Sequence, residues 1–164
     1  SDNNYTTVAL SRYVTAVASG KKYNYQLMDR IVDASGKTVK KYKADYEDIS
    51  DTLTDSQWDA LHSGMRQVVS TMDRFQGFDI PVAGKTGTAQ QTGHANHGLF
   101  IGYAPYDDPE ITIAVRIANG YSSHNAATAA RNVISYYYKE TSMKDIKEMK
   151  AAGVNGNTRN SVAD

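Results

Sequence analysis

The strict alternation of residues 111–118, ITIAVRIA, restricts the fold more than any other stretch of the chain. Successive side chains of a β-strand point to opposite faces of a sheet, so this pattern predicts a strand with two different faces. A second apolar segment, 99–104, precedes it, and the turn-forming residues 106–109 lie between the two. The sequence therefore predicts two neighbouring strands in antiparallel succession.

Three segments carry apolar side chains at helical spacing, about 7–18, 54–70 and 126–137. The expected end signals are Thr6 or Thr7 before the first helix, Gly20 after it, the capping box Thr54-Asp55-Ser56-Gln57 at the start of the second, and Ser123 or Asn125 before the third. The apolar stripes consist of Leu10, Tyr13, Val14 and Val17, then Trp58, Leu61, Met65, Val68 and Met72, then Ala126, Ala130, Val133, Ile134 and Tyr137.

Two further segments complete the order of elements. Residues 27–42 predict a hairpin with Ser35-Gly36 at its turn, and the segment around 80–89 predicts a short strand. The order helix, hairpin, helix, three strands, helix indicates an α+β fold, an antiparallel sheet flanked by helices. We expect residues 1–140 to belong to one domain and residues 141–164 to form a polar tail. In that tail a frail helix, with Met143, Ile146 and Met149, precedes a largely disordered stretch.

Composition excludes several classes of protein. The 164 residues include 18 Lys and Arg against 18 Asp and Glu, so no basic excess favours a nucleic-acid partner. The absence of cysteine excludes disulfides and thiolate metal sites. No apolar run approaches the roughly 18 residues that a membrane helix needs. His94 and His97 are expected to be exposed loop residues, unless His97 begins the strand that pairs with the segment around 80–89, and we expect no metal and no cofactor.

Residues 83–90, AGKTGTAQ, have a composition that neither a core strand nor a helix favours. One interpretation, a phosphate-binding loop, requires a glycine at position 79 and a helix after the motif. Asp79 stands there instead, and the residues after Gly87 begin a helix poorly, so this interpretation is rejected. A second interpretation is a glycine-rich edge strand without chemistry, in which Ala83, Gly84 and Gly87 permit the close approach of a backbone or a ligand.

The third interpretation is a strand that binds a carboxylate and an acyl group. Lys85 supplies a positive charge, and Thr86 and Thr88 supply hydroxyl donors for an anion. Backbone N–H groups along an exposed strand edge can bond an extended peptide, or an oxyanion formed from it. Gly87 leaves room for a substrate against the strand. This interpretation alone gives each residue type a reason.

Lys85-Thr86-Gly87-Thr88 resembles the K-T-G motif of penicillin-binding proteins and serine β-lactamases. The resemblance extends over residues 3–138 to the C-terminal part of class B penicillin-binding-protein transpeptidase domains, and implies that residues 1–140 are the C-terminal portion of such a domain. The segments that carry it are NNYTTVALSRYVTAVASG, TDSQWDALHSGMRQVV, VAGKTGTAQ, HGLFIGYAPYDDPEITIAVRIANG and AATAARNVISYYY. It implies catalytic roles for Lys85 and Thr88, with the Thr88 backbone N–H as half of the oxyanion hole. It also implies substrate binding by Thr86, Gly87 and Thr88.

The family's mechanism also needs a serine nucleophile in an S-x-x-K motif and a second motif, S-x-N, both ahead of K-T-G. Ser1-Asp2-Asn3 and Ser19-Gly20-Lys21-Lys22 match these patterns literally, but in the reversed order. The nucleophile should begin a helix, so that its lysine lies one turn on, whereas Ser19 ends one. Both matches are interpreted as chance. We expect the chain to be inactive without the upstream half of its domain.

The resemblance implies a parent protein that crosslinks cell-wall stem peptides by acyl transfer through a serine acyl-enzyme. Its expected partners are peptidoglycan stem peptides, β-lactams and the upstream half of the same domain. Such a parent is membrane-anchored and acts on the extracytoplasmic face of the bacterial cell membrane. Two alternatives stay open. One is a serine β-lactamase or D,D-carboxypeptidase, which uses water as acceptor, and the other is a non-catalytic sensor or binding domain on the same scaffold.

Overall fold

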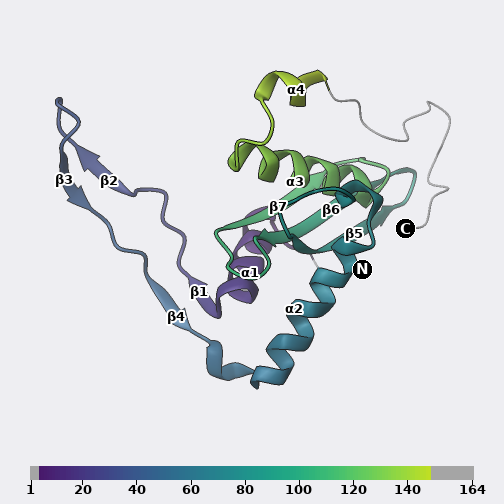
Figure 1. The fold of residues 1–164 in the computed structure, drawn as a ribbon, viewed down its shortest axis with the longest axis horizontal. Coiled ribbons are helices and arrows are strands. Elements are labelled where there is room, and N and C mark those ends of the chain that lie inside the picture. The colour runs from purple at the N-terminus through teal and green to yellow at the C-terminus, as the bar shows by residue number, and fades with distance from the viewer. Residues whose placement is uncertain (1–3, 149–164) are drawn as a thin grey trace.

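A three-stranded antiparallel sheet forms the centre of the computed structural model, which describes residues 4–148 (Figure 1). Its strands are β5 (Ala83–Gln91), β6 (His94–Ala104) and β7 (Ile111–Ile117), in the order β5-β6-β7. The central strand β6 is the longest, and most of its alternate residues are buried. β5 pairs only with β6 within the described chain and is therefore an edge strand. The predicted antiparallel α+β architecture is confirmed.

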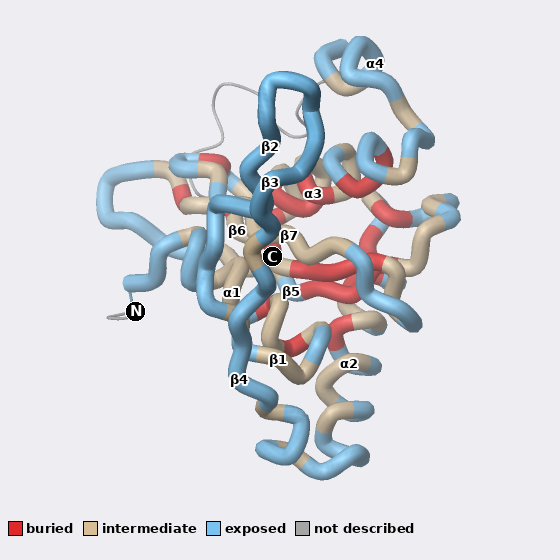
Figure 2. Tube along the Cα trace, turned by 90° about the vertical axis from the view of Figure 1, so that its left-hand side faces the viewer, coloured by how far each residue is buried: buried red, intermediate tan, exposed pale blue. Residues whose placement is uncertain are grey.

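Helices cover both faces of this sheet. α1 (Thr7–Ser19) and α2 (Asp55–Ser70) lie on one face, and α3 (Ser123–Tyr137) lies on the other. The first face packs Tyr103, Ile101 and Ala83 of the sheet against Val14, Val17 and Met65 of the helices. The second packs Phe100 and Ala104 against the buried residues Ala126, Ala127, Ala130 and Ile134 of α3, with Val69, Met72, Phe75 and Val82 at one end. Figure 2 shows the buried segments along the strands and α3.

The helix ends follow the local signals of the sequence. Thr6 caps α1 by accepting a bond from the Ala9 N–H, and Gly20 ends it in the left-handed region at φ 65°. α2 begins with the full capping box between Thr54 and Gln57, so these predictions are confirmed. The residues that follow α2 include a 3-10 turn, η2 (Asp73–Phe75), that leads toward β5.

The prediction for the last helix is wrong in two respects. Its cap is Ser122, whose side chain accepts from the His124 N–H, so the helix begins three residues earlier than expected. Val133 and Tyr137 are about half exposed instead of facing the core. The small side chains of Ala126, Ala127 and Ala130 let α3 approach the sheet closely, and this places the buried stripe on the alanine side of the helix. On α1, Tyr13 is likewise exposed rather than inward-facing.

A long arm leaves the body between α1 and α2 (Figure 1). Its base is the ribbon of β1 (Lys21–Tyr23) and β4 (Tyr46–Asp48), and its tip is the hairpin of β2 (Arg30–Val32) and β3 (Thr38–Lys41). Another 3-10 turn, η1 (Ser50–Thr52), joins the arm to α2. The hairpin over 27–42 is confirmed, whereas the β1–β4 pairing has no counterpart in the sequence prediction. Every residue from 24 to 41 is exposed.

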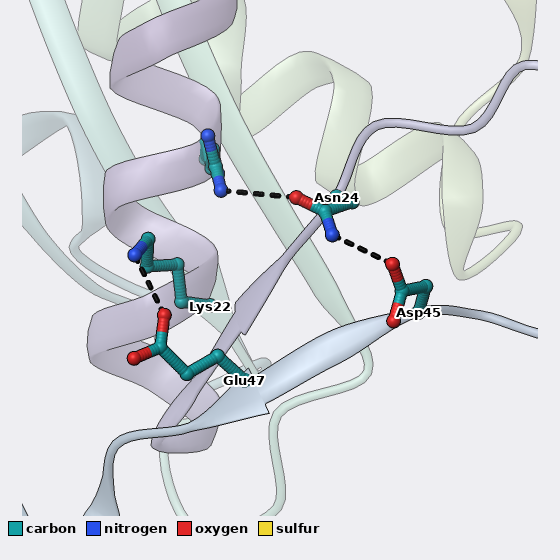
Figure 3. Close-up of polar contacts among 5 residues, drawn as sticks. Lys22, Asn24, Asp45 and Glu47 are labelled. Atoms are coloured by element: carbon teal, nitrogen blue, oxygen red, sulfur yellow. Dashed lines mark hydrogen bonds and ion pairs between the residues drawn. The ribbon is translucent and has the colours of Figure 1, made fainter.

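Polar contacts hold the base of the arm together (Figure 3). Lys22 forms an ion pair with Glu47 at 2.7 Å, and the Asn24 amide donates to the Asp45 carboxylate, also at 2.7 Å. Arg12 of α1 donates to the Asn24 side-chain oxygen at 3.3 Å, which ties the base to the body. The hydrogen bond from Lys22, together with its positive charge, lowers the pKa of the Glu47 carboxyl below its ordinary value.

The predicted tail begins with a short helix, α4 (Met143–Glu148), none of whose residues is buried. The helix expected around 143–149 is thus confirmed up to Glu148, while Met149 and the stretch expected to be disordered lie outside the described residues. Over residues 4–148 we find no helix with the length and apolar character that crossing a bilayer demands.

Candidate active site at the open edge of β5

Strand β5 presents Lys85-Thr86-Gly87-Thr88 at the edge of the sheet. These four residues lie opposite Ile101, Phe100, Leu99 and Gly98 of β6, in that order. Partners share a face, so the Lys85 side chain projects on the side of α1 and α2, while Thr86 and Thr88 project on the side of α3. Lys85 is exposed, and the two threonines are partly buried. Lys85 forms no ion pair within residues 4–148.

The main-chain N–H and C=O groups of β5 alternate in direction along the strand. Two hydrogen bonds on the β7 side of β6 show which residues of β6 face β7 and which face β5. The carbonyl oxygens of Asn96 and Ala104 accept from the N–H groups of Tyr121 and Glu110, at 3.0 and 2.9 Å, on the β7 side of β6. Alternate residues of a strand direct their N–H and C=O groups to the same side. The even-numbered residues of β6 therefore face β7, and the odd-numbered ones face β5.

The pairing register between β5 and β6 then determines which residues of β5 face β6. Lys85 and Gly87 lie opposite the odd-numbered residues Ile101 and Leu99, so they form the ladder bonds to β6. The N–H and C=O groups of Thr86 and Thr88 consequently point away from β6, toward the open edge. The register shift occurs only after Ala89 and leaves this arrangement intact. The edge can thus offer main-chain donors and acceptors to an extended peptide beside the Lys85 charge.

The two glycines of the motif have different surroundings. A Cβ added at Gly84 would lie 2.4 Å from Cζ of Phe100 and 2.7 Å from the Ile101 carbonyl oxygen, so this glycine is required by packing inside the chain. A Cβ at Gly87 would meet Leu99 Cβ at 3.5 Å, an ordinary contact. Of the two alternatives predicted for Gly84, the close approach of a backbone is confirmed by the Ile101 carbonyl, and no ligand could enter because Phe100 occupies the remaining space.

A groove of about 820 Å³ adjoins Thr88. Four consecutive residues of β5, 88–91, line it together with the segment 4–7 and Leu10 at the start of α1. His97, Leu99 and Arg116 of the neighbouring strands complete the lining. His94 and His97 both lie in β6, so the loop expected for His94 is wrong. The alternative for His97, a place in the strand that pairs with the K-T-G strand, is confirmed. Within the described part of the chain, no cluster of His, Asp or Glu could hold a metal ion.

The match to the S-x-x-K motif at Ser19 has no catalytic geometry. Ser19 is the last residue of α1, and its hydroxyl donates to the Thr15 carbonyl at 2.7 Å and accepts from the Lys21 N–H at 3.2 Å. That hydroxyl therefore closes a helix end. Ser1 lies outside the described residues. The described site consists of one strand edge with its charge, hydroxyls and amides.

Comparison with known proteins identifies the class to which this fold and strand edge belong. The penicillin binding protein transpeptidase domain matches residues 3–135, and the chain belongs to that family. It is 28% identical over 158 residues to the peptidoglycan D,D-transpeptidase MrdA of Haemophilus influenzae, covering 82% of this chain and 24% of that protein. It is 36% identical over 102 residues to MrdA of Acinetobacter baumannii, covering 51% of this chain and 15% of the relative.

A solved structure shares the fold. Penicillin-binding protein A of M. tuberculosis, as its imipenem acyl-enzyme complex, superposes with a TM-score of 0.73 at 20% identity. The match covers 84% of this chain and 32% of that one. The chain thus spans about a quarter or less of the length of the two MrdA relatives.

Proposed function

We propose that the chain is the C-terminal portion of the transpeptidase domain of a peptidoglycan D,D-transpeptidase. The observation that carries the proposal is the open edge of β5, where Lys85 and the outward-facing amides of Thr86 and Thr88 lie on one strand. Family membership and the names of the MrdA relatives support it. Residues 1–140 belong to this portion in the proposal, and residues 141–164 form a tail.

In the proposed reaction, a serine from the upstream half of the domain attacks the carbonyl carbon of a D-alanyl-D-alanine peptide bond. The terminal D-alanine leaves, and an amine of a neighbouring stem peptide then takes the acyl group and frees the serine. Lys85 supplies positive charge next to the terminal carboxylate, which the Thr86 and Thr88 hydroxyls bind. The Thr88 N–H stabilises the negative oxygen that develops in the transition state. Gly87 leaves room for the peptide against the strand.

The direction of the Thr88 N–H provides a sharp test. Proline at position 88 removes the N–H without removing a ladder bond to β6, because that N–H points away from β6. In the complete transpeptidase that contains this chain, Thr88→Pro is expected to slow acylation by a fluorescent penicillin by about 100-fold or more. Thr88→Ala keeps the N–H and serves as the matched control. Equal acylation rates for the two variants would refute the role of this amide.

The chain by itself is a second test. Without the upstream serine it is expected neither to hydrolyse a labelled penicillin nor to be acylated by it. Intact-protein mass spectrometry after incubation measures this directly, and mixing with the upstream half is expected to restore labelling. Stoichiometric labelling of the isolated chain would refute the assignment of the nucleophile to the upstream half.

The complete protein distinguishes the proposal from its two alternatives. A transpeptidase forms a slowly decaying acyl-enzyme with penicillin, whereas a β-lactamase or a D,D-carboxypeptidase passes the acyl group to water. A sensor that lacks the nucleophile or the acceptor reaction would show no crosslinking of stem peptides.

We place the parent protein, membrane-anchored, on the extracytoplasmic face of the membrane. Its partners in this proposal are stem peptides, β-lactams and the upstream half, with no nucleic acid.

A further inference from the structure

The groove beside Thr88 continues the open edge of β5. Residues 88–91 all line it, so the groove follows the strand for about 10 Å at the usual rise of 3.3 Å per residue. Two or three residues of an extended peptide bonded to the edge would therefore run along this groove. A substituent on that peptide would come into contact with the groove's polar side chains.

The described residues that line the groove carry one permanent charge. Arg116 of β7 is the only Lys or Arg among its described lining residues, and that lining includes no Asp or Glu. Arg116 is exposed and forms no ion pair within residues 4–148. The lining is therefore complementary to an anion.

His97 lies beside the Arg116 guanidinium and does not use its hydrogen-bonding capacity. The Asn119 N–H donates to Nδ1 of His97 at 3.0 Å, so in the neutral ring the hydrogen is assigned to Nε2. Nε2 lies 2.5 Å from the Gln91 amide and 2.9 Å from a terminal nitrogen of Arg116. With the Gln91 amide oriented so that its oxygen faces the ring, Nε2–H donates to it. Because Nε2 then carries a hydrogen, it cannot accept from Arg116, and the guanidinium keeps its N–H groups for a ligand.

The geometry points to a carboxylate-binding subsite, in which Arg116 pairs with a side-chain carboxylate of the stem peptide that carries the acyl group. This inference rests on the proposed function, since it takes the peptide to lie along β5. A carboxylate matches the planar fork of an arginine, which can bind both oxygens at once. The subsite would favour stem peptides whose diamino acid bears a free carboxylate over those with an amidated or absent one.

A titration that involves no acylation tests the subsite separately from the proposed reaction. The probes are an N-acetylated stem tripeptide ending in meso-diaminopimelate and the same peptide with the side-chain carboxylate amidated. Chemical shifts of the ¹⁵N-labelled chain, held in its complex with the unlabelled upstream half of the domain, report binding at the Arg116 Nε and at the Thr88 and His97 amides. We expect about five-fold or greater preference for the free carboxylate, the size of a partly exposed ion pair.

Two variants test whether the charge of Arg116 causes this preference. Arg116→Gln is expected to abolish the preference, and Arg116→Lys to retain part of it. Arg30→Gln removes one positive charge from the exposed arm and is expected to leave the preference unchanged. Equal affinity for the two peptides, or a preference that survives in Arg116→Gln, would overturn the subsite. Because no covalent step is involved, a failure of the Thr88→Pro test would leave these outcomes interpretable.

Discussion

Gly84 and Gly87 lie three residues apart on β5 and have different constraints. At Gly84 the aromatic ring of Phe100 and a backbone carbonyl already occupy the place of a side chain. At Gly87 only Leu99 is near, at an ordinary contact distance. The first glycine therefore belongs to the core, and the second belongs to the proposed substrate edge.

Exchanging each glycine for alanine should separate these two constraints. Gly84→Ala is expected to lower the free energy of unfolding by about 1 to 3 kcal/mol, because Phe100 and the ladder must move. Gly87→Ala is expected to leave the melting temperature within about 2 °C, while slowing penicillin acylation in the complete protein. Thermal melts and acylation rates check both. A large loss of stability at position 87, or none at position 84, would contradict the packing described above.

Tyr103 is buried, and its hydroxyl has no hydrogen-bond partner among the described residues. Burial raises its pKa to about 12, above the value of about 10 in an unfolded chain. The folded state thus holds the proton more tightly. Stability from this group is complete below pH 10 and is lost as the pH rises from 10 toward 12.

Tyr103→Phe is expected to remove this share of the alkaline loss, which is about 1.4 kcal/mol at pH 11 and about 2 to 3 kcal/mol once the pH exceeds 12. At neutral pH the variant should be as stable as the parent chain or more stable, since an unsatisfied buried hydroxyl is deleted. Urea unfolding at pH 8, 10 and 11 measures both effects. The same alkaline slope with and without the hydroxyl would rule out Tyr103 as its source.

At the scale of elements, features with local signals can be predicted from the sequence. The caps at Thr6 and Thr54 and the alternation in β7 each depend on a few neighbouring residues. The β1–β4 ribbon has no such signal, because it joins residues such as Lys22 and Glu47, 25 positions apart. The rotation of α3 depends equally on packing, since the sheet selects its alanine face.

The same limit applies to the candidate site. The sequence places Lys85, Thr86, Gly87 and Thr88 on one strand, because all four are consecutive. Arg116 and His97 lie in a groove that only the pairing of β5, β6 and β7 assembles. One signal was available in the sequence. Arg116 is the only charged residue in the alternating run 111–118.

The arm is expected to be dispensable for the stability of the body. Its residues 24–41 are all exposed, and the contacts of Asn24, Lys22 and Arg12 close its base. Replacing residues 28–42 by a short Gly-Ser turn should therefore change the melting temperature by no more than about 2 °C. Deletion of β6, His94–Ala104, is the contrasting control and should abolish folding. A large drop on arm removal would mean that the hairpin supports the core.

The capping box of α2 offers a second test on an element. Thr54→Ala removes the side-chain acceptor for the Gln57 N–H and is expected to cost about 1 kcal/mol. Thr54→Ser keeps the hydroxyl and should retain most of the stability. Chemical denaturation midpoints measure the difference. If the two variants have equal midpoints, the cap contributes nothing to the stability of the fold.

The whole molecule has exposed apolar side chains on several surfaces. On the outer faces of α1 and α3 these are Val8, Tyr13, Val133, Tyr136 and Tyr137, each about half exposed. Such surface favours association when nothing covers it. We expect the isolated chain to self-associate at micromolar concentrations and to melt with low cooperativity.

Sedimentation velocity over a hundredfold range of concentration measures this association. Adding the upstream half of the domain is expected to shift the chain into a one-to-one complex with a sharper melt. A strictly monomeric chain with a cooperative melt at every concentration would contradict the expectation and would show that the piece is autonomous.

The amide that β5 turns outward at Thr88 belongs to the peptide link rather than to a side chain. A substitution at this position changes the size, polarity or hydroxyl content of the side chain. Every encoded amino acid except proline nevertheless supplies the same main-chain N–H. Inherited variation at residue 88 can therefore adjust how firmly a ligand is held while the donor itself persists. Among substitutions at this position, only proline removes it.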